Sequence, residues 1–126
     1  MTGRELMERH VRAFNAAVAD GDWEPMLARF TEDSELRFEN VPAGPFVGLH
    51  AIRCAYADQP PTDTIQLLGI QENDEHHVAA AFAWSQGGTG RMLLEHDRGA
   101  VTRLTVAFDV DIGVGSTEPT GSDAPA

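Results

Sequence analysis

The stretch HVAAAFAWSQGGTGRMLLEHDRGAVTRLTVAF, residues 77–108, decides the fold class of this chain. It contains runs in which apolar residues alternate with polar or small ones, a pattern typical of half-buried strands. The runs span residues 77–85, 89–96 and 100–109, with turns at 86–88 and 97–99. Glycines 87, 88 and 90 are assigned to the first turn, and no helix follows them to form a phosphate loop. This stretch therefore predicts an antiparallel meander with one apolar face.

Further strands are predicted on the N-terminal side of the meander. Residues 64–71 form a strand-like run that leads into a turn predicted at Asn73-Asp74. Residues 34–39 alternate between apolar and charged side chains, so they predict an earlier, half-buried strand. The segment 41–45 contains two prolines and a glycine and is predicted to be a loop.

Most of the remaining N-terminal sequence has helical spacing. Thr2 and Glu5 have the spacing of a capping box, and apolar residues recur at steps of three and four as far as Val18. A short second helix is predicted over residues 23–30. A third begins after Gly48 and ends before two consecutive prolines.

Strands gathered after helices predict an α+β fold with the helices on one face of the sheet. We expect one domain over residues 1–112, because a chain of 126 residues that is 42% hydrophobic suffices for a single core. Residues 113–126 are rich in Gly, Ser, Thr, Pro and acidic side chains, and we predict that they are disordered.

The composition restricts the partners and the location. The formal charge is −11, from 20 acidic and 9 basic side chains, which disfavours binding to nucleic acid or to anionic membrane surfaces. No signal peptide or membrane-spanning run is recognisable, so we expect a cytoplasmic protein. Cys54 is the single cysteine, which excludes an intrachain disulfide and a thiolate zinc site; we expect it to be a buried free thiol. No metal or nucleotide cofactor is indicated.

Several short motifs follow one another in a characteristic order. They are Phe14-Asn15-Ala16-Ala17 before Gly21-Asp22-Trp23, Phe30-Thr31-Glu32-Asp33, Gly48 before Ala51-Ile52, and Gly99-Ala100-Val101-Thr102-Arg103-Leu104. Their order resembles the SnoaL-like branch of the nuclear transport factor two-like superfamily. The resemblance implies a cone in which three N-terminal helices pack on a curved antiparallel sheet around an apolar pocket, usually in a homodimer. The superfamily includes isomerases, polyketide cyclases, hydrolases and non-catalytic binding proteins, so the fold does not decide the function.

The resemblance also locates the catalytic groups of the superfamily's ketosteroid isomerases. Those enzymes use a tyrosine, an aspartate base and a protonated aspartic acid. The corresponding positions fall on Phe14, Phe38 and, to within a residue or two, Met92. Because all three side chains are apolar, we do not expect typical ketosteroid isomerase activity.

Glu39, His96 and Asp109 are the candidate catalytic residues. Glu39 lies next to the position of the lost base, although strand alternation directs it away from the side that Phe38 faces. The polyketide cyclases that the chain resembles use a late aspartate, which suggests Asp109 or Asp111; alternation turns Asp109 outward. His96 ends a meander strand, where it could orient a ligand.

The candidate ligand-binding residues are the large side chains on the predicted inner faces. They are Phe14, Phe38, Tyr56, Phe82, Trp84, Met92, Leu104 and Phe108. An ordinary hydrophobic core is the alternative interpretation of most of them, and Tyr56 is the candidate polar contact. His76 and His77 are neighbours on a strand, so their side chains point apart and do not predict a metal site.

Two functions remain open at this point. The first is a cofactor-free isomerase, cyclase or hydrolase that acts on a small hydrophobic molecule by acid–base catalysis. The second is a non-catalytic ligand-binding or protein-interaction module, which the apolar residues at the isomerase positions favour. A homodimer is expected from the resemblance and from the small outward-facing side chains of Ala79, Ala81 and Ala83.

Overall fold

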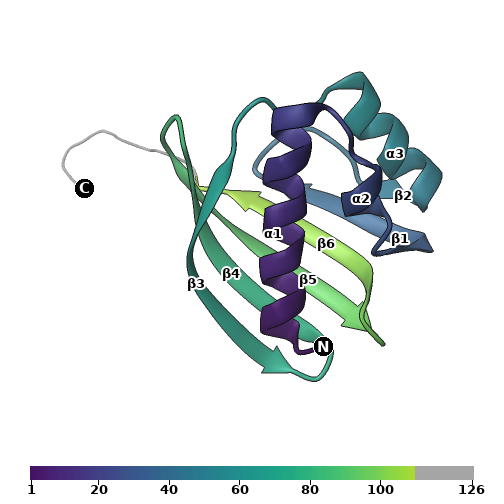
Figure 1. Ribbon diagram of the computed structural model, residues 1–126, viewed down its shortest axis with the longest axis vertical. Helices are drawn as coiled ribbons and strands as arrows, with labels where there is room; N and C mark the ends of the chain where they lie inside the picture. The colour runs from purple at the N-terminus through teal and green to yellow at the C-terminus, as the bar shows by residue number, and fades with distance from the viewer. Residues whose placement is uncertain (110–126) are drawn as a thin grey trace.

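The computed structural model describes residues 1–109 of the chain. Helices lie on one face of a curved six-stranded sheet, with strand order β2-β1-β6-β5-β4-β3 (Figure 1). The elements are α1 (Gly3–Asp20), α2 (Glu24–Leu27), β1 (Phe30–Glu39), β2 (Phe46–Val47), α3 (Leu49–Asp58), β3 (Ile65–Asp74), β4 (His77–Trp84), β5 (Thr89–Asp97) and β6 (Ala100–Phe108). The predicted α+β class is therefore confirmed.

The long helix α1 begins and ends as its sequence predicts. Glu5 N donates to Thr2 Oγ1 at 3.1 Å while Thr2 N donates to Glu5 Oε1 at 2.9 Å, which completes the capping box. Gly21 ends the helix in the left-handed conformation, with φ 80°, which glycine adopts without steric cost. The helix buries its apolar face, including Met7 and Phe14, against the sheet.

The meander β3-β4-β5-β6 is antiparallel throughout, as predicted. The sheet also contains one parallel pair, because β1 lies beside β6 with Phe38 opposite Val106. This pairing joins the first strand of the chain to the last one described. It leaves α3 packed beside β1 and β2 at one end of the sheet, while α1 lies over β3 and β4 toward the other end (Figure 1).

Several element boundaries differ from the sequence prediction. The second helix stops at Leu27, because Val101 N donates to Arg29 O at 2.7 Å and Phe30 already pairs with Val101 in the sheet. Pairing across the sheet here overrides the local helical spacing. The turn predicted at Asn73-Asp74 lies one or two residues later, and β2 was not predicted.

Two single residues also differ from expectation. Gly90 is not part of the turn: it is buried in β5, where a Cβ would lie 2.6 Å from both Ala107 O and the ring of Phe82. Cys54 is exposed rather than buried, because α3 turns Ile52 and Tyr56 toward the core instead. The buried-thiol prediction is therefore wrong.

Side chains of α1 cover the free edge of the sheet at β3. Asn15 Nδ2 donates to Ile65 O at 2.8 Å and Ile65 N donates to Asn15 Oδ1 at 2.9 Å, so one amide replaces a missing neighbouring strand. Arg4 donates to Ile70 O further along the same edge, at 3.2 Å. Blocking an edge in this way protects it from pairing with other chains.

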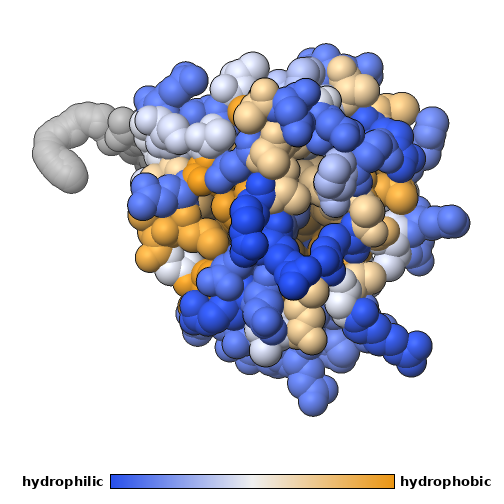
Figure 2. All heavy atoms as spheres, viewed as in Figure 1, coloured by the Kyte–Doolittle hydropathy of each residue, from blue (hydrophilic) through white to orange (hydrophobic). Residues whose placement is uncertain are grey.

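Hydrophilic side chains cover much of the face that carries the helices (Figure 2). In the part of the chain that the structure describes, no helix has the length and apolar character required to cross a bilayer. The tail predicted to be disordered, residues 113–126, lies outside the described residues, as does Asp111.

Candidate functional site

An apolar cavity of about 210 Å³ lies between α3 and the β1-β6 end of the sheet. Strand residues Leu36, Phe38, Phe46 and Phe108 form one part of its wall, and Ala55 and Tyr56 of α3 form another, together with Gln59 just after the helix. Val41, Ala43 and Pro61, from the connecting loops, complete the described lining. A concave, mainly aromatic site with few polar groups is the usual form of a small-molecule site.

The alternation and register of the strands determine which aromatic side chains form the sheet side of the cavity wall. Phe38 points inward because it alternates with the exposed Arg37 and Glu39 along β1. Its ring stacks on Phe108 of β6, with centroids 6.2 Å apart and planes 24° apart. Phe108 in turn stacks on Trp84 of β4, at 5.9 Å and 4°. The sheet side of the cavity is therefore a continuous row of rings that reaches back into the core.

Tyr56 supplies the phenol of the cavity wall. Its ring stacks on Trp23 with centroids 4.7 Å apart and planes 24° apart, which fixes its orientation. The side chain is almost fully buried, and this burial raises the pKa of the phenol far above its ordinary value. The hydroxyl therefore stays protonated near neutral pH and is available as a hydrogen-bond donor.

Tyr56 is the one side chain of the described wall that carries a hydroxyl. Within residues 1–109, the one side-chain nitrogen or oxygen that is fully enclosed and lacks a partner is His96 Nε2. No hydrogen bond within the same residues satisfies the Tyr56 hydroxyl, so this hydroxyl is not fully enclosed. Because Tyr56 lines the cavity, its phenol is a candidate hydrogen-bond donor to a molecule that enters the cavity.

A second hollow, of about 370 Å³, adjoins the apolar cavity. The two share Phe38, Val41 and Ala43, so the loop after β1 separates them. Glu39 lines the second hollow and not the apolar cavity, as strand alternation predicts. Among the described lining residues, the apolar cavity carries no carboxylate, imidazole or cationic side chain.

The other two candidate catalytic residues are not among the described residues of the cavity wall. His96 packs at the start of α1, where its Nε2 would lie 3.2 Å from a Cβ on Gly3. Burial and the nearby His76 and His77 lower its pKa. Asp109 is exposed and accepts a hydrogen bond from Thr89 Oγ1 at 2.7 Å. The structure therefore does not bring Glu39, His96 and Asp109 together.

The predicted ligand-binding residues divide into two groups. Phe38, Tyr56 and Phe108 line the cavity, while Trp84 supports Phe108 from behind. The others, Phe14, Phe82, Met92 and Leu104, belong to the buried core. Sequence reasoning missed Gln59, which caps the C-terminus of α3 in a non-helical conformation, so helical spacing gave no signal for it.

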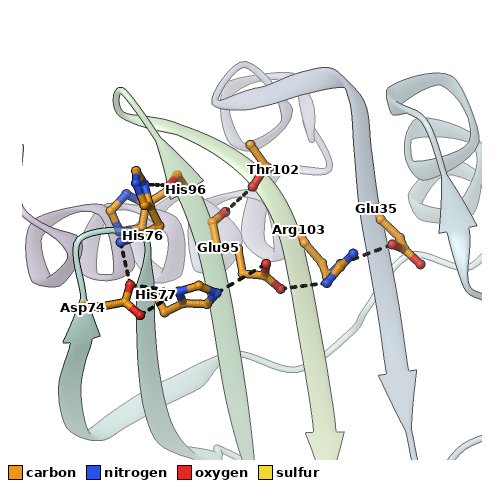
Figure 3. A network of polar contacts seen from close by, with 8 residues as sticks. All are labelled: Glu35, Asp74, His76, His77, Glu95, His96, Thr102 and Arg103. Carbon is orange, nitrogen blue, oxygen red and sulfur yellow. Dashed lines mark hydrogen bonds and ion pairs between the residues drawn. The ribbon is translucent and has the colours of Figure 1, made fainter.

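The largest polar network lies on the opposite face of the sheet. Arg103 bridges Glu35 at 3.2 Å and Glu95 at 3.1 Å, and Glu95 lies 3.5 Å from His77 Nε2 (Figure 3). His77 also pairs with Asp74, which raises the pKa of the imidazole. In residues 1–109 no group of three or more metal-binding side chains is placed to hold an ion. The network ties neighbouring strands together.

Comparison with known proteins identifies the family. The family model for the SnoaL-like domain matches residues 11–121. The chain therefore belongs to the SnoaL-like family. A search of curated proteins gave no match.

Solved structures share the fold at low sequence identity. A proposed ketosteroid isomerase from Kribbella flavida superposes with a TM-score of 0.70 and 17% identity, covering 97% of this chain and 92% of that one. A proposed polyketide cyclase from Xanthomonas campestris gives a TM-score of 0.61 and 21% identity, with 84% and 92% covered. A protein of unknown function with a cystatin-like fold from Methylobium petroleophilum gives 0.63 and 18%, with 94% and 85% covered. These likenesses confirm the nuclear transport factor two-like fold.

Proposed function

We propose that this protein binds a small hydrophobic molecule in the cavity between α3 and the β1-β6 end of the sheet. The observation that carries the proposal is the apolar cavity whose wall includes the stacked rings of Phe38 and Phe108 together with Tyr56. Transfer of apolar surface from water into such a wall is favourable by about 25 cal/mol per Å². The phenol then orients the bound molecule.

The proposal is of binding rather than acid–base catalysis, because of what the described wall contains. A general base must lie within hydrogen-bond reach of the proton that it removes. The described wall contains no carboxylate or imidazole, and the phenol has a raised pKa, so it stays protonated and offers no phenolate to accept a proton. Binding of a hydrophobic molecule, in contrast, requires only the apolar wall and the hydrogen-bond donor of Tyr56.

A dye-binding experiment tests the proposal. Prodan, a neutral two-ring dye whose emission shifts to shorter wavelength when it leaves water, is titrated with the protein. Ala55→Phe places a ring in the cavity and should abolish the shift, whereas Ala57→Phe makes the same change on the exposed side of α3 and should preserve it. Equal binding by both variants, or none by the unaltered protein, would contradict the proposal.

A second candidate is a cofactor-free enzyme in which Glu39 is the base. The supporting observation is that the hollow lined by Glu39 shares Phe38, Val41 and Ala43 with the cavity. In D₂O such an enzyme would exchange the α-protons of a bound cyclic ketone for deuterium, which NMR detects. Exchange that Glu39→Gln abolishes, without weakening dye binding, would support this candidate; exchange at the uncatalysed rate would exclude it for that ketone.

We also propose a homodimer in the cytoplasm, formed through the sheet face opposite the helices. Ala79 and Ala81 lie on this face, beside a shallow hollow of about 300 Å³ that Gly69 and Arg91 also line. Small side chains let a second sheet approach closely. The support for this arrangement is the shape of the face together with the resemblance to the superfamily.

A further inference from the structure

We propose, on the basis of the binding function above, that the cavity selects a neutral molecule of one or two rings with a single hydrogen-bond-accepting oxygen. The oxygen accepts from the Tyr56 hydroxyl while the ring lies against Phe38 and Phe108. Anionic molecules and molecules of four fused rings are excluded. This inference names the ligand class, which the fold alone leaves open.

The size limit follows from the cavity volume of about 210 Å³. An apolar protein cavity of roughly 150 Å³ accommodates benzene. The additional volume here holds one further ring or a short substituent, whereas four fused rings would extend beyond it through the open side of the cavity, where they gain less apolar contact. On the α3 and sheet sides there is little extra room, because Leu36 and Tyr56 are buried in the core and the rings behind the wall are stacked; the adjoining hollow lies on the side of the loop after β1.

The charge preference follows from the described wall, whose members are apolar apart from Tyr56 and Gln59. An anion entering it would leave water without meeting a cation, at a cost of several kcal/mol. The Tyr56 hydroxyl offers a single uncharged donor, which suits a carbonyl or ether oxygen. Because burial keeps this phenol protonated, the donor is present across the physiological pH range.

Two tryptophans report on the two sides of the cavity. Trp23 lies behind Tyr56, and Trp84 lies behind Phe108. The sequence contains no other tryptophan, so Trp84→Phe leaves emission from the α3 side alone and Trp23→Phe leaves emission from the sheet side alone. A ligand bound in the proposed orientation should change both signals, and its oxygen should affect mainly the Trp23 signal.

Four matched competitors displace prodan in the test. They are 1-tetralone, tetralin, tetrahydro-1-naphthoate and the four-ring ketone androstenedione. We expect 1-tetralone to bind about fivefold more tightly than tetralin, the effect of one hydrogen bond. Tyr56→Phe should remove this advantage and leave the affinity for tetralin unchanged. The carboxylate should not displace the dye, and androstenedione should bind at least about tenfold more weakly than 1-tetralone.

The outcomes separate this inference from the function on which it rests. If prodan binds and Ala55→Phe abolishes binding, but 1-tetralone and tetralin compete equally, the inference of an accepting oxygen fails while the binding function stands. Tight binding of androstenedione or of the carboxylate overturns the size or the charge limit in the same way. If neither the dye nor any competitor binds, the binding function itself fails. Thermal unfolding of Tyr56→Phe confirms that any loss is local.

Discussion

At the scale of single residues, Gly90 shows how little space separates the strands from the core aromatics. A methyl group at this position would lie 2.6 Å from both the carbonyl oxygen of Ala107 and the ring of Phe82. We therefore predict that Gly90→Ala lowers the free energy of unfolding by about 3 kcal/mol. Urea denaturation measures the change.

Gly69 provides the matched control for that substitution. It also lies in the sheet region, but a Cβ there would meet nothing within 4 Å. Gly69→Ala should leave stability unchanged or raise it by a fraction of a kcal/mol, because alanine restricts the unfolded chain. If the two variants were equally stable, the close approach at Gly90 would not be a real constraint.

His10 makes the stability depend on pH. Burial lowers its pKa from 6.5 to about 4, so the folded protein binds a proton less readily than the unfolded chain. Its full contribution is present above about pH 6.5 and is lost as the pH falls from there toward 4, by about 3 kcal/mol in total. His10→Leu should flatten this part of the curve of unfolding free energy against pH.

Two other histidines also affect the dependence of the unfolding free energy on pH. His96 has a lowered pKa for reasons of burial, so its contribution is also lost on acidification below about pH 6.5. His77 has a raised pKa beside Asp74, so its contribution is present at low pH and is lost as the pH rises through the folded-state value. A curve that stayed flat between pH 6.5 and 4 in the unaltered protein would contradict the prediction for His10.

At the scale of elements, Asn15 joins α1 to the free edge of the sheet. Its amide both donates to and accepts from the backbone of Ile65. Asn15→Ala removes both bonds, and we predict a loss of about 2 kcal/mol together with faster hydrogen exchange at the Ile65 amide. Arg12→Ala, at an exposed site on the same helix, is the control and should leave that amide protected.

The type of an element was predictable from the sequence where its apolar residues repeat with a single helical or strand spacing over its whole length. The capping box and apolar spacing of α1, and the alternation of β4, depend on local sequence and were confirmed. The end of α2 and the start of β1 depend on hydrogen bonds to β6, about seventy residues away, which no local pattern contains. The strand β2 gave no recognisable signal for a different reason: it is only two residues long, which is too short to show alternation.

The candidate site was only partly predictable from the sequence. Inner-face alternation identified Phe38 and Phe108, and helical spacing identified Tyr56. The same criteria selected Phe14 and Met92, which lie in the core, because periodicity distinguishes an inner face from an outer one but not a cavity wall from a filled interior. The loop residues of the wall follow no period.

At the scale of the whole molecule, the proposed dimer can be tested through one exposed alanine. Ala81 lies on the sheet face away from the helices. Ala81→Arg should shift the molar mass from twice 13.6 kDa to 13.6 kDa in size-exclusion chromatography with light scattering, because a bulky charge prevents close approach. Ala57→Arg on α3 should leave the mass unchanged. A monomeric unaltered protein at high concentration would overturn the dimer.

The parallel pairing of β1 with β6 has a consequence for synthesis on the ribosome. Residues 30–39 emerge early, yet their hydrogen-bonding partner is the last strand described, residues 100–108. Contacts so distant in sequence form slowly, since a long loop must close first. Until β6 has emerged, β1 lacks the neighbour that completes its ladder, and Phe38 lacks Phe108. The cavity is therefore completed only after β6 has emerged, and a nascent chain is expected to bind the proposed ligand only once residues 100–108 have been translated.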